Sequence, residues 1–325
     1  MDNPFADLGA ITVQFSHVAY RFGPGFAERR TGIGHYQTWN REETRARLPE
    51  ADVLVVSGFW NDALLEAADR LRFIQSIGAG YDQFPLDELR RRGIRLASAR
   101  GANSKAVSEH AMAMILALAR QLHTGRDHQA KHAWRGMISD SAQREDELGG
   151  KTLLIIGLGA IGSRLARMAR AFDMRVLGVK RNLNVADSAA DEVHALDKVD
   201  QLLPRADFVV LTCPFTPETA DIINARALSR MKPSACLVNV ARGGCVDEPA
   251  LLQALRSGGI AGAALDSFKA EPLPADSPFW DLENVILTPH TAGETRRYEE
   301  NVIDILLENL GRLSRGEADL VNQIV

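Results

Sequence analysis

Lys151-Thr-Leu-Leu-Ile-Ile-Gly157-Leu-Gly159-Ala-Ile-Gly162 is the stretch that decides the fold of this 325-residue chain. An apolar run over Thr152–Ile156 leads directly into a G-x-G-x-x-G loop, and a helical pattern follows over Ile161–Phe172. A second apolar run, Arg175–Val179, comes next at the distance that a βαβ unit needs. This order of strand, loop, helix and strand is typical of a dinucleotide-binding turn. The alternative is a tight βα turn that binds nothing.

Each residue of this loop has a physical reason to be there. Gly157 permits the tight turn, Gly159 lets a pyrophosphate approach the backbone, and Gly162 lets the helix pack on the strand. At the N-terminus of the helix, around Ala160 and Ile161, free N–H groups and the positive end of the helix dipole favour phosphate. We therefore expect these five residues to bind a dinucleotide.

Short apolar runs alternate with helical patterns on both sides of the loop, which predicts βαβ units and mostly parallel sheets. We predict an α/β fold with two doubly wound parallel-sheet domains. In the first hundred residues the expected strands are Ile11–Val18, Ala51–Ser57, Phe73–Ser76 and Ile94–Ser98, with helices at Asn61–Ala68 and Leu86–Arg92. From Lys151 on, the six expected strands are Thr152–Ile156, Arg175–Val179, Phe208–Thr212, Cys236–Asn239, Gly262–Asp266 and Val285–Leu287, with further helices at Ala225–Met231 and Glu248–Ser257.

Two long helical patterns connect these regions. The first, Lys105–His123, leads from the first α/β layer into the second, and the last, Arg296–Leu313, is long enough to return to the first layer. The polar stretch His123–Glu147 has weak periodicity and is expected to form an arm or extended loop. His128 and His132 stand four residues apart in it, but no third ligand completes a site, so we expect no metal.

Composition excludes several classes of protein. Apolar residues make up 46% of the chain and charged residues 25%, which is ordinary for a globular protein and excludes disorder as a main theme. The net charge of −4 offers no electrostatic basis for binding nucleic acid. The longest apolar run, Ala111–Ala119, is too short for a membrane helix, and no signal peptide is visible. Three cysteines cannot form a disulfide framework, so a reducing, cytoplasmic location is expected.

The second strand of the βαβ unit ends at two cations. An acid that would bind the ribose 2′-hydroxyl of NAD is expected here, but the sequence has Lys180 and Arg181. Two cations can pair with a 2′-phosphate, so the sequence predicts a preference for NADP(H), with NAD(H) possible. The alternative is two solvated charges after a strand.

Three further segments follow predicted strands, where ligands bind in open α/β sheets. They are Asn239–Asp247, Ala264–Pro272 and Leu287–Gly293, and they offer a guanidinium, a carboxylate and an imidazole. An arginine can hold a carboxylate in a bidentate fork, and a histidine can transfer a proton near neutral pH. This set suits the reduction of a 2-keto acid. The alternative for each residue is structural: a charge at a helix start, a turn residue and a loop histidine.

The chain resembles the D-isomer-specific 2-hydroxyacid dehydrogenase family over nearly its whole length, most densely over Asn103–Gly293. Beside the glycine loop, the motifs that carry the resemblance are Gly78-Ala-Gly80-Tyr-Asp82, Asn103 with Val107-Ser-Glu-His110, Met231-Lys-Pro, Val238-Asn-Val-Ala-Arg242-Gly, Glu271-Pro272 and Thr288-Pro-His290.

The resemblance implies roles for individual residues. Arg242 would bind the substrate carboxylate and keto oxygen, and His290, paired with Glu271, would donate a proton to the nascent alkoxide. Asp266 would hold the nicotinamide amide. Backbone N–H groups would also bind the carboxylate, at Gly78, Ala79 and Gly80. The remaining expected cofactor contacts are Cys213, Pro214, Thr219, Ala241 and Gly293. For Cys213, a small packing residue is favoured over a reactive thiol. His110 is expected to be packed rather than catalytic.

The resemblance also implies a domain plan. Residues 1–102, completed by 295–325, would form a smaller flavodoxin-like substrate domain, and residues 103–294 a central Rossmann domain for NAD(P). The two would hinge near Asn103 and Gly293, and the cofactor domains would build a homodimer. Three large aromatic residues could narrow the pocket and favour small acids such as glyoxylate or hydroxypyruvate, namely Phe59, Trp60 and Trp280. The alternative is that all three belong to the core or to a subunit contact. The alternatives are a corepressor-like protein that senses NAD(H), and a phosphite or formate dehydrogenase on the same fold.

Overall fold

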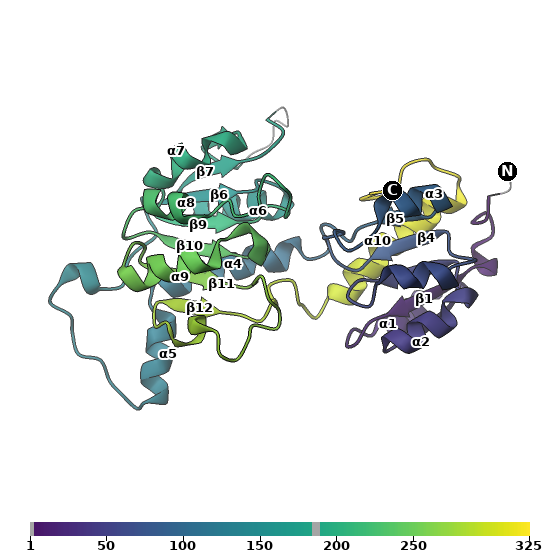
Figure 1. Ribbon diagram of the computed structural model, residues 1–325, viewed down its shortest axis with the longest axis horizontal. Helices are drawn as coiled ribbons and strands as arrows, with labels where there is room; N and C mark the ends of the chain where they lie inside the picture. The colour runs from purple at the N-terminus through teal and green to yellow at the C-terminus, as the bar shows by residue number, and fades with distance from the viewer. Residues whose placement is uncertain (1–2, 184–188) are drawn as a thin grey trace. The chain divides into compact units, whose positions relative to one another are not determined.

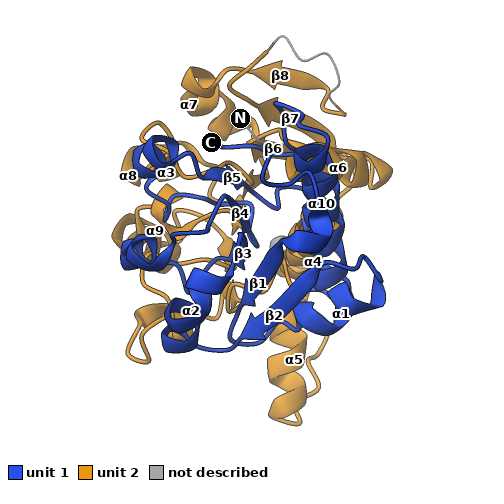
Figure 2. Cartoon of the chain, turned by 90° about the vertical axis from the view of Figure 1, so that its right-hand side faces the viewer, with its two compact units in different colours: residues 1–103, 295–325 blue, residues 104–294 orange. Residues whose placement is uncertain are grey.

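The computed structural model describes residues 3–183 and 189–325 of the chain and divides into two compact units (Figure 1; Figure 2). Unit 1 comprises residues 1–103 and 295–325, and unit 2 comprises residues 104–294. The roles that the sequence assigns to these units, substrate binding and cofactor binding, remain predictions.

Unit 1 is built on a five-stranded parallel sheet in the order β2-β1-β3-β4-β5. Its strands are β1 (Thr12–Ser16), β2 (Gly34–Thr38), β3 (Val53–Val56), β4 (Phe73–Ser76) and β5 (Arg95–Ala97). Its helices are α1 (Phe22–Glu28), α2 (Arg41–Arg47), α3 (Leu86–Arg92) and α10 (Tyr298–Ser314). Side chains alternate between the two faces of the sheet: Val53 and Val55 pack with α1 and α10, whereas Leu54 and Val56 pack with α3. The sheet is therefore covered on both faces, as a doubly wound fold requires.

Strand β2 and helices α1 and α2 of unit 1 were not predicted, and one prediction was wrong in type. Strand β2 is a polar edge strand in which only Thr38 is buried, so the sequence contains no apolar run that would predict it. Helix α1 contains Phe-Gly-Pro-Gly, and it is held by burial of Phe22 and Phe26 rather than by helix propensity. Helix α2 has charged side chains at all positions except Thr44 and Ala46, so it shows no apolar periodicity. The helix expected at Asn61–Ala68 is a 3₁₀ helix, Asp62–Ala67.

Unit 2 is built on a seven-stranded parallel sheet in the order β12-β11-β10-β9-β6-β7-β8. Its strands are β6 (Thr152–Ile156), β7 (Arg175–Val179), β8 (Glu192–His194), β9 (Phe208–Leu211), β10 (Cys236–Asn239), β11 (Gly262–Leu265) and β12 (Val285–Leu287). Strand β8 was not predicted, because it has three half-buried residues at the edge of the sheet. After β8 the chain returns to the other side of β6, so the strand order reverses between β6 and β9. Ligands of open α/β sheets bind at such a reversal.

Helices cover both faces of this sheet. Helices α4 (Ser104–Ala119) and α6 (Ala160–Ala171) pack with one set of buried side chains, and α8 (Ala225–Arg230) and α9 (Glu248–Ser257) with the other. A short helix, α7 (Val199–Leu202), packs on the same face as α8 and α9. The doubly wound parallel architecture predicted from the sequence is thus present in both units.

The stretch expected to form an arm begins with a helix, α5 (Leu122–Ala130), and continues as mostly irregular chain to residue 147 (Figure 1). Trp134 and Met137 are fully exposed on this segment, which Arg135 and Glu145 tie together by an ion pair. In the described part of the chain, no three His, Cys, Asp or Glu side chains gather in a way that could hold a metal ion. None of the helices in residues 3–183 and 189–325 has the length and apolar character needed to cross a membrane.

Candidate active site

The three glycines of the loop after β6 are required for three different reasons. A Cβ on Gly157 would lie 2.4 Å from the backbone nitrogen of Cys213, and its φ of +110° is one that L residues rarely adopt. A Cβ on Gly162 would lie 2.5 Å from the carbonyl oxygen of Gly157, so this glycine allows α6 to approach the strand. Gly159, by contrast, has no neighbour within 4 Å of where its Cβ would be. Open space over Gly159, beside the first N–H groups of α6, fits a pyrophosphate.

The loop after β9 faces the glycine loop across the point where the strand order reverses. Thr212 Oγ1 donates a hydrogen bond of 2.7 Å to the carbonyl oxygen of Gly157 and so joins the two loops. Thr219 is buried, and its hydroxyl bonds within its own loop, donating to Pro214 O at 2.7 Å and accepting from Thr216 N at 2.8 Å. Its role is therefore to shape the loop. Cys213 is also buried, and a hydrogen bond with Cys245, together with burial, raises the pKa of its thiol. Cys213 is a packing residue rather than a reactive thiolate.

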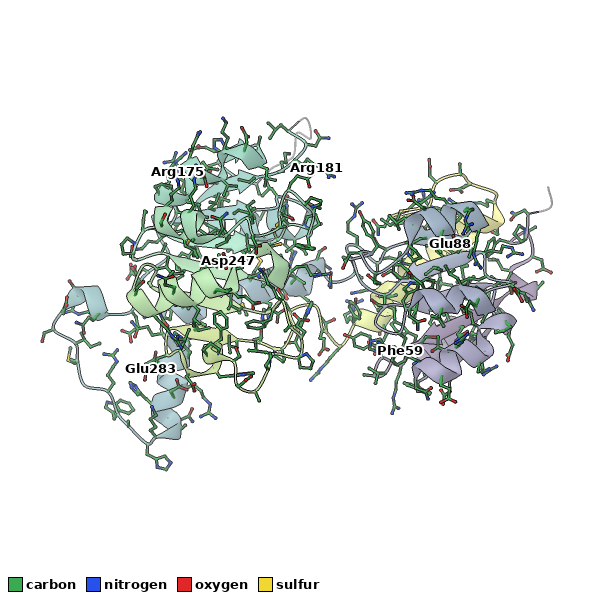
Figure 3. All side chains as sticks on the ribbon, viewed as in Figure 1. Phe59, Glu88, Arg175, Arg181, Asp247 and Glu283 are labelled. Carbon is green, nitrogen blue, oxygen red and sulfur yellow. The ribbon has the colours of Figure 1, made fainter. Side chains whose placement is uncertain are left out.

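The two predicted phosphate-binding cations follow β7 at its carboxyl end. Figure 3 shows Arg175 and Arg181 at opposite ends of this strand. Arg181 is exposed, and Lys180 is half-buried with its backbone N–H bonded to His194 O at 3.1 Å. A hydrogen bond from Thr216 and, less strongly, the charge of Arg181 lower the pKa of Glu218. Arg181 therefore lies near the loop that follows β9.

Arg242 follows β10 in a loop that Asn239 organises. The buried Asn239 side chain accepts from Ala241 N and donates to Arg242 O, both at 3.0 Å. The guanidinium donates one bond, from Nη1 to Ala241 O at 2.8 Å, and its side chain is half-buried. A Cβ on Gly243 would lie 2.0 Å from the backbone carbon of Phe268. This close approach brings the Arg242 loop against the loop that leads to Glu271.

Glu271 and His290 form a hydrogen-bonded pair, which is the pairing that the family resemblance implies. His290 Nδ1 lies 2.7 Å from Glu271 Oε2, and the second oxygen of Glu271 accepts from Phe268 N at 2.9 Å. His290 has a φ of +56° and a side chain that is 44% exposed, so its ring is accessible. The carboxylate thus orients an imidazole whose other nitrogen is open to a reactant.

A pocket of about 670 Å³ lies beside this pair. Its walls are mostly apolar and come from residues 268–290: Phe268, Glu271, Pro272, Leu273, Trp280, Leu287, Thr288, Pro289 and His290. Trp280 lines it and is half exposed, and its indole N–H donates to Pro274 O at 2.9 Å. Trp60, the other tryptophan considered for pocket size, is instead 7% exposed and packs on Phe84, so the core interpretation is correct for it.

Asp266 is buried at the carboxyl end of β11, where it accepts three hydrogen bonds from the turn that carries His290. The donors are Thr288 Oγ1 at 2.6 Å, Thr291 N at 2.9 Å and Ala292 N at 3.1 Å. Asp266 therefore fixes this turn, whatever it contributes to the nicotinamide. Sequence reasoning missed Thr288, although it stands in the Thr-Pro-His motif, and missed Asn239 in the motif that ends at Arg242.

The remaining predicted residues lie elsewhere. Ala241 is buried beside Arg242, and Gly293 closes the segment after His290. The residues of the Gly78–Gly80 segment follow β4 in unit 1, where Ser76 Oγ donates to the carbonyl oxygens of Gly78 and Gly80, each at 3.3 Å. Their assignment to the substrate carboxylate stays a prediction.

Comparison with known proteins identifies the family. Residues 112–292 match the sequence model described as D-isomer specific 2-hydroxyacid dehydrogenase, NAD binding domain. The glyoxylate reductase of Pyrococcus furiosus is 37% identical over 293 residues, which cover 88% of this chain and 86% of that protein. The D-3-phosphoglycerate dehydrogenase of Methanocaldococcus jannaschii is 36% identical over 295 residues, which cover 90% of this chain and 54% of that protein. The chain thus spans about half the length of that relative.

A solved structure agrees with these relatives. A D-isomer specific 2-hydroxyacid dehydrogenase family protein from Aeromonas salmonicida aligns with a TM-score of 0.84 and 32% identity, covering 97% of this chain and 99% of that one. The match extends over both units. The chain belongs to the D-isomer specific 2-hydroxyacid dehydrogenase family of oxidoreductases.

Proposed function

We propose that this protein reduces a small 2-keto acid, of the glyoxylate or hydroxypyruvate type, to the D-2-hydroxy acid, with NADP(H) preferred over NAD(H). The observation that carries the proposal is the 2.7 Å contact between His290 Nδ1 and Glu271 Oε2 beside an open pocket. Bound nicotinamide would supply the hydride, and residues of the chain would bind the substrate and supply the proton.

The contact between Glu271 and His290 determines which ring nitrogen transfers a proton. Because a carboxylate only accepts hydrogen bonds, His290 Nδ1 carries a hydrogen in both protonation states of the ring. The proton that moves is therefore the one on Nε2. In reduction, His290 donates this proton to the oxygen of the former keto group and is left neutral, still bonded to Glu271.

Arg242 is assigned to the substrate carboxylate. Its Nη1 donates to Ala241 O, which holds the guanidinium plane. Its other N–H groups have no acceptor within residues 3–183 and 189–325, so they remain for a bidentate contact. The backbone at Gly78, Ala79 and Gly80 is also proposed to bind a substrate carboxylate. Asp266 has two buried oxygens that accept three bonds, which leaves capacity for one from a carboxamide.

The cofactor preference rests on charge. Lys180 and Arg181 stand where an acid would accept a bond from a ribose hydroxyl, and an acid there would repel a 2′-phosphate. The exposure of Arg181 lets its guanidinium reach a phosphate from solvent. Contacts of this kind contribute about 1.5–3 kcal/mol each, or roughly 10- to 100-fold in discrimination.

Two further features of the protein are proposed. The exposed Trp134 and Met137 on the arm support a homodimer built through unit 2, because large apolar side chains at full exposure favour burial against a partner. All three cysteines are free thiols, which supports a reducing compartment such as the cytoplasm. Light scattering at several protein concentrations tests the first of these, and a monomer at every concentration would overturn it.

The test of the function is a turnover screen with NADPH and NADH against glyoxylate, hydroxypyruvate and larger 2-keto acids, with formate and phosphite oxidation as separate arms. Reduction of a small 2-keto acid, lost in both Arg242→Ala and His290→Ala, is the expected result. Turnover of formate or phosphite alone would overturn the substrate class. Tight NAD(H) binding with no turnover in any arm would instead favour a nucleotide-sensing, corepressor-like protein.

A further inference from the structure

His110 makes a contact that the proposed reaction does not use. It lies on α4, far in sequence from the site, and its Nε2 is 3.1 Å from Thr288 Oγ1, two residues before His290. Its side chain is 24% exposed, so the ring is mostly enclosed. Nε2 is also 3.8 Å from Asp266 Oδ1. His110 thus connects α4 to the turn that carries the proposed general acid.

The direction of each hydrogen bond in this chain can be deduced. Asp266 accepts from two backbone N–H groups and from Thr288, so its carboxylate is an acceptor throughout. The single hydroxyl hydrogen of Thr288 is committed to Asp266, so its oxygen can only accept from His110. His110 must therefore carry its hydrogen on Nε2. The order is His110 to Thr288 to Asp266, and each donor strengthens the next.

These hydrogen bonds act on the strained turn that carries His290. His290 has a φ of +56°, which is uncommon for a residue with a side chain, and its N–H donates to Thr288 O at 3.0 Å. Asp266 binds the turn at Thr288, Thr291 and Ala292, on both sides of His290. A hydroxyl with two partners holds one rotamer, whereas with one partner it can rotate and release the carboxylate.

We infer, resting on the function proposed above, that His110 is a positioning residue, which acts through Thr288 and Asp266 to hold the His290 turn where the imidazole meets both Glu271 and the substrate. Because it touches no reacting atom, its loss lowers kcat more than it raises the KM of either substrate.

The kinetics of four single variants test the hydrogen-bond series from His110 through Thr288 to Asp266. His110→Leu and Thr288→Val each remove one link, and we expect each to lower kcat about tenfold, the scale of one hydrogen bond. His110→Gln and Thr288→Ser keep a donor and a hydroxyl, and should retain more than half of the activity. The double variant His110→Leu/Thr288→Val should be no slower than either single variant, because both break the same chain.

A control on the same helix separates positioning from general damage to α4. Glu109→Gln removes the ion pair with Arg164 of α6 but leaves Thr288 untouched, so its kcat should equal that of the wild type. Thermal melting of all variants is measured in parallel. Three results would overturn the inference. The first is a kcat of the double variant that falls by the product of the two single losses. The others are equal losses of kcat in His110→Gln and His110→Leu, and any loss of kcat in Glu109→Gln.

A readout without turnover keeps the two proposals distinguishable. The imidazole of His290 is observed by NMR with histidine labelled at ¹³Cε1, and its signal is assigned by its absence in His290→Gln. His110→Leu should shift or broaden this signal, and His110→Gln should leave it near its wild-type position. If the wild type reduces no 2-keto acid, the proposed function fails, and this signal alone decides the positioning role. An unmoved His290 signal in His110→Leu would overturn it.

Discussion

His290 and Glu271 meet through one short contact, in which Nδ1 lies 2.7 Å from Oε2, although the two residues come from different loops of unit 2. The second oxygen of Glu271 is bound by Phe268 N, so the carboxylate cannot turn away from the ring. The imidazole is thereby oriented with Nδ1 on the carboxylate, which leaves Nε2 as the nitrogen that exchanges a proton with a reactant.

His290→Ala should lower kcat for 2-keto acid reduction by about 10²–10⁴, the contribution of a positioned general acid. Glu271→Gln should cost less, about 10–10², because an amide keeps a hydrogen bond that orients the ring but lacks the negative charge of the carboxylate. Steady-state rates at saturating cofactor measure both. Glu283→Gln, an exposed carboxylate marked in Figure 3, is the matched control and should behave as the wild type. Unchanged rates in both site variants would contradict the assigned pair.

Lys180→Asp combined with Arg181→Ser should move the ratio of kcat/KM for NADPH to that for NADH by about 10- to 100-fold toward NADH. The variant removes two cations and restores the acid that binds a ribose 2′-hydroxyl. Initial rates with each reduced cofactor measure the ratio. A wild type that already favours NADH, or a ratio that the variant leaves in place, would show that these cations do not recognise the phosphate.

Two alanine substitutions in the glycine loop should affect different properties, one the stability of the fold and the other cofactor binding. Gly157→Ala should lower the free energy of unfolding by at least about 2 kcal/mol, because its Cβ would collide with the backbone at Cys213 and its φ is +110°. Gly159→Ala should change it by less than about 0.5 kcal/mol, because its φ is −97° and no atom lies within 4 Å of the new Cβ. The same methyl group should instead raise the Kd of NADP(H) about tenfold. Urea unfolding and calorimetric titration measure the two quantities.

If Gly159→Ala unfolds as easily as Gly157→Ala, the space over Gly159 is filled by the protein and is no cofactor site. If Gly159→Ala binds NADP(H) as tightly as the wild type, the pyrophosphate does not approach this residue.

Glu192 should make the stability of unit 2 depend on acid pH. Hydrogen bonds from Arg205 and His194, with a further one from Arg175, lower the pKa of Glu192 from 4.5 to about 2. A carboxylate whose folded pKa is depressed stabilises the fold above its unfolded pKa and stops doing so as pH falls through the folded value. The Tm of Glu192→Gln should therefore lie below that of the wild type at neutral pH, and the difference should shrink between about pH 4.5 and pH 2.

The effect of Glu192 is expected to be small, since its partners are partly exposed and solvent screens their charges. Melting curves of wild type, Glu192→Gln and Glu283→Gln across this pH range measure it. A Tm difference that stays constant down to pH 2 would show that the charge of Glu192 is not what stabilises β8 against β7.

The sequence by itself determined the fold class and most of unit 2, because local signals there agree with one another. The apolar runs of β6, β7 and β10 are buried on both faces and read as strands with the right bounds. Gly157 and Gly162 indicate a tight turn at two positions where a side chain would collide with the backbone. Arg242, Glu271 and His290 follow strand ends, where a parallel sheet collects ligands.

Only the tertiary structure decided the edges and the connections between distant residues. Strands β2 and β8 are polar, and their backbones become strands because a neighbour in the sheet offers hydrogen bonds. Helix α1 forms around two phenylalanines that find a core. His110 and Thr288 are separated by 178 residues, and no local sequence pattern predicts their contact. Propensity and periodicity act over one element, whereas an edge strand or a hydrogen bond between elements depends on which surfaces the folded chain brings together.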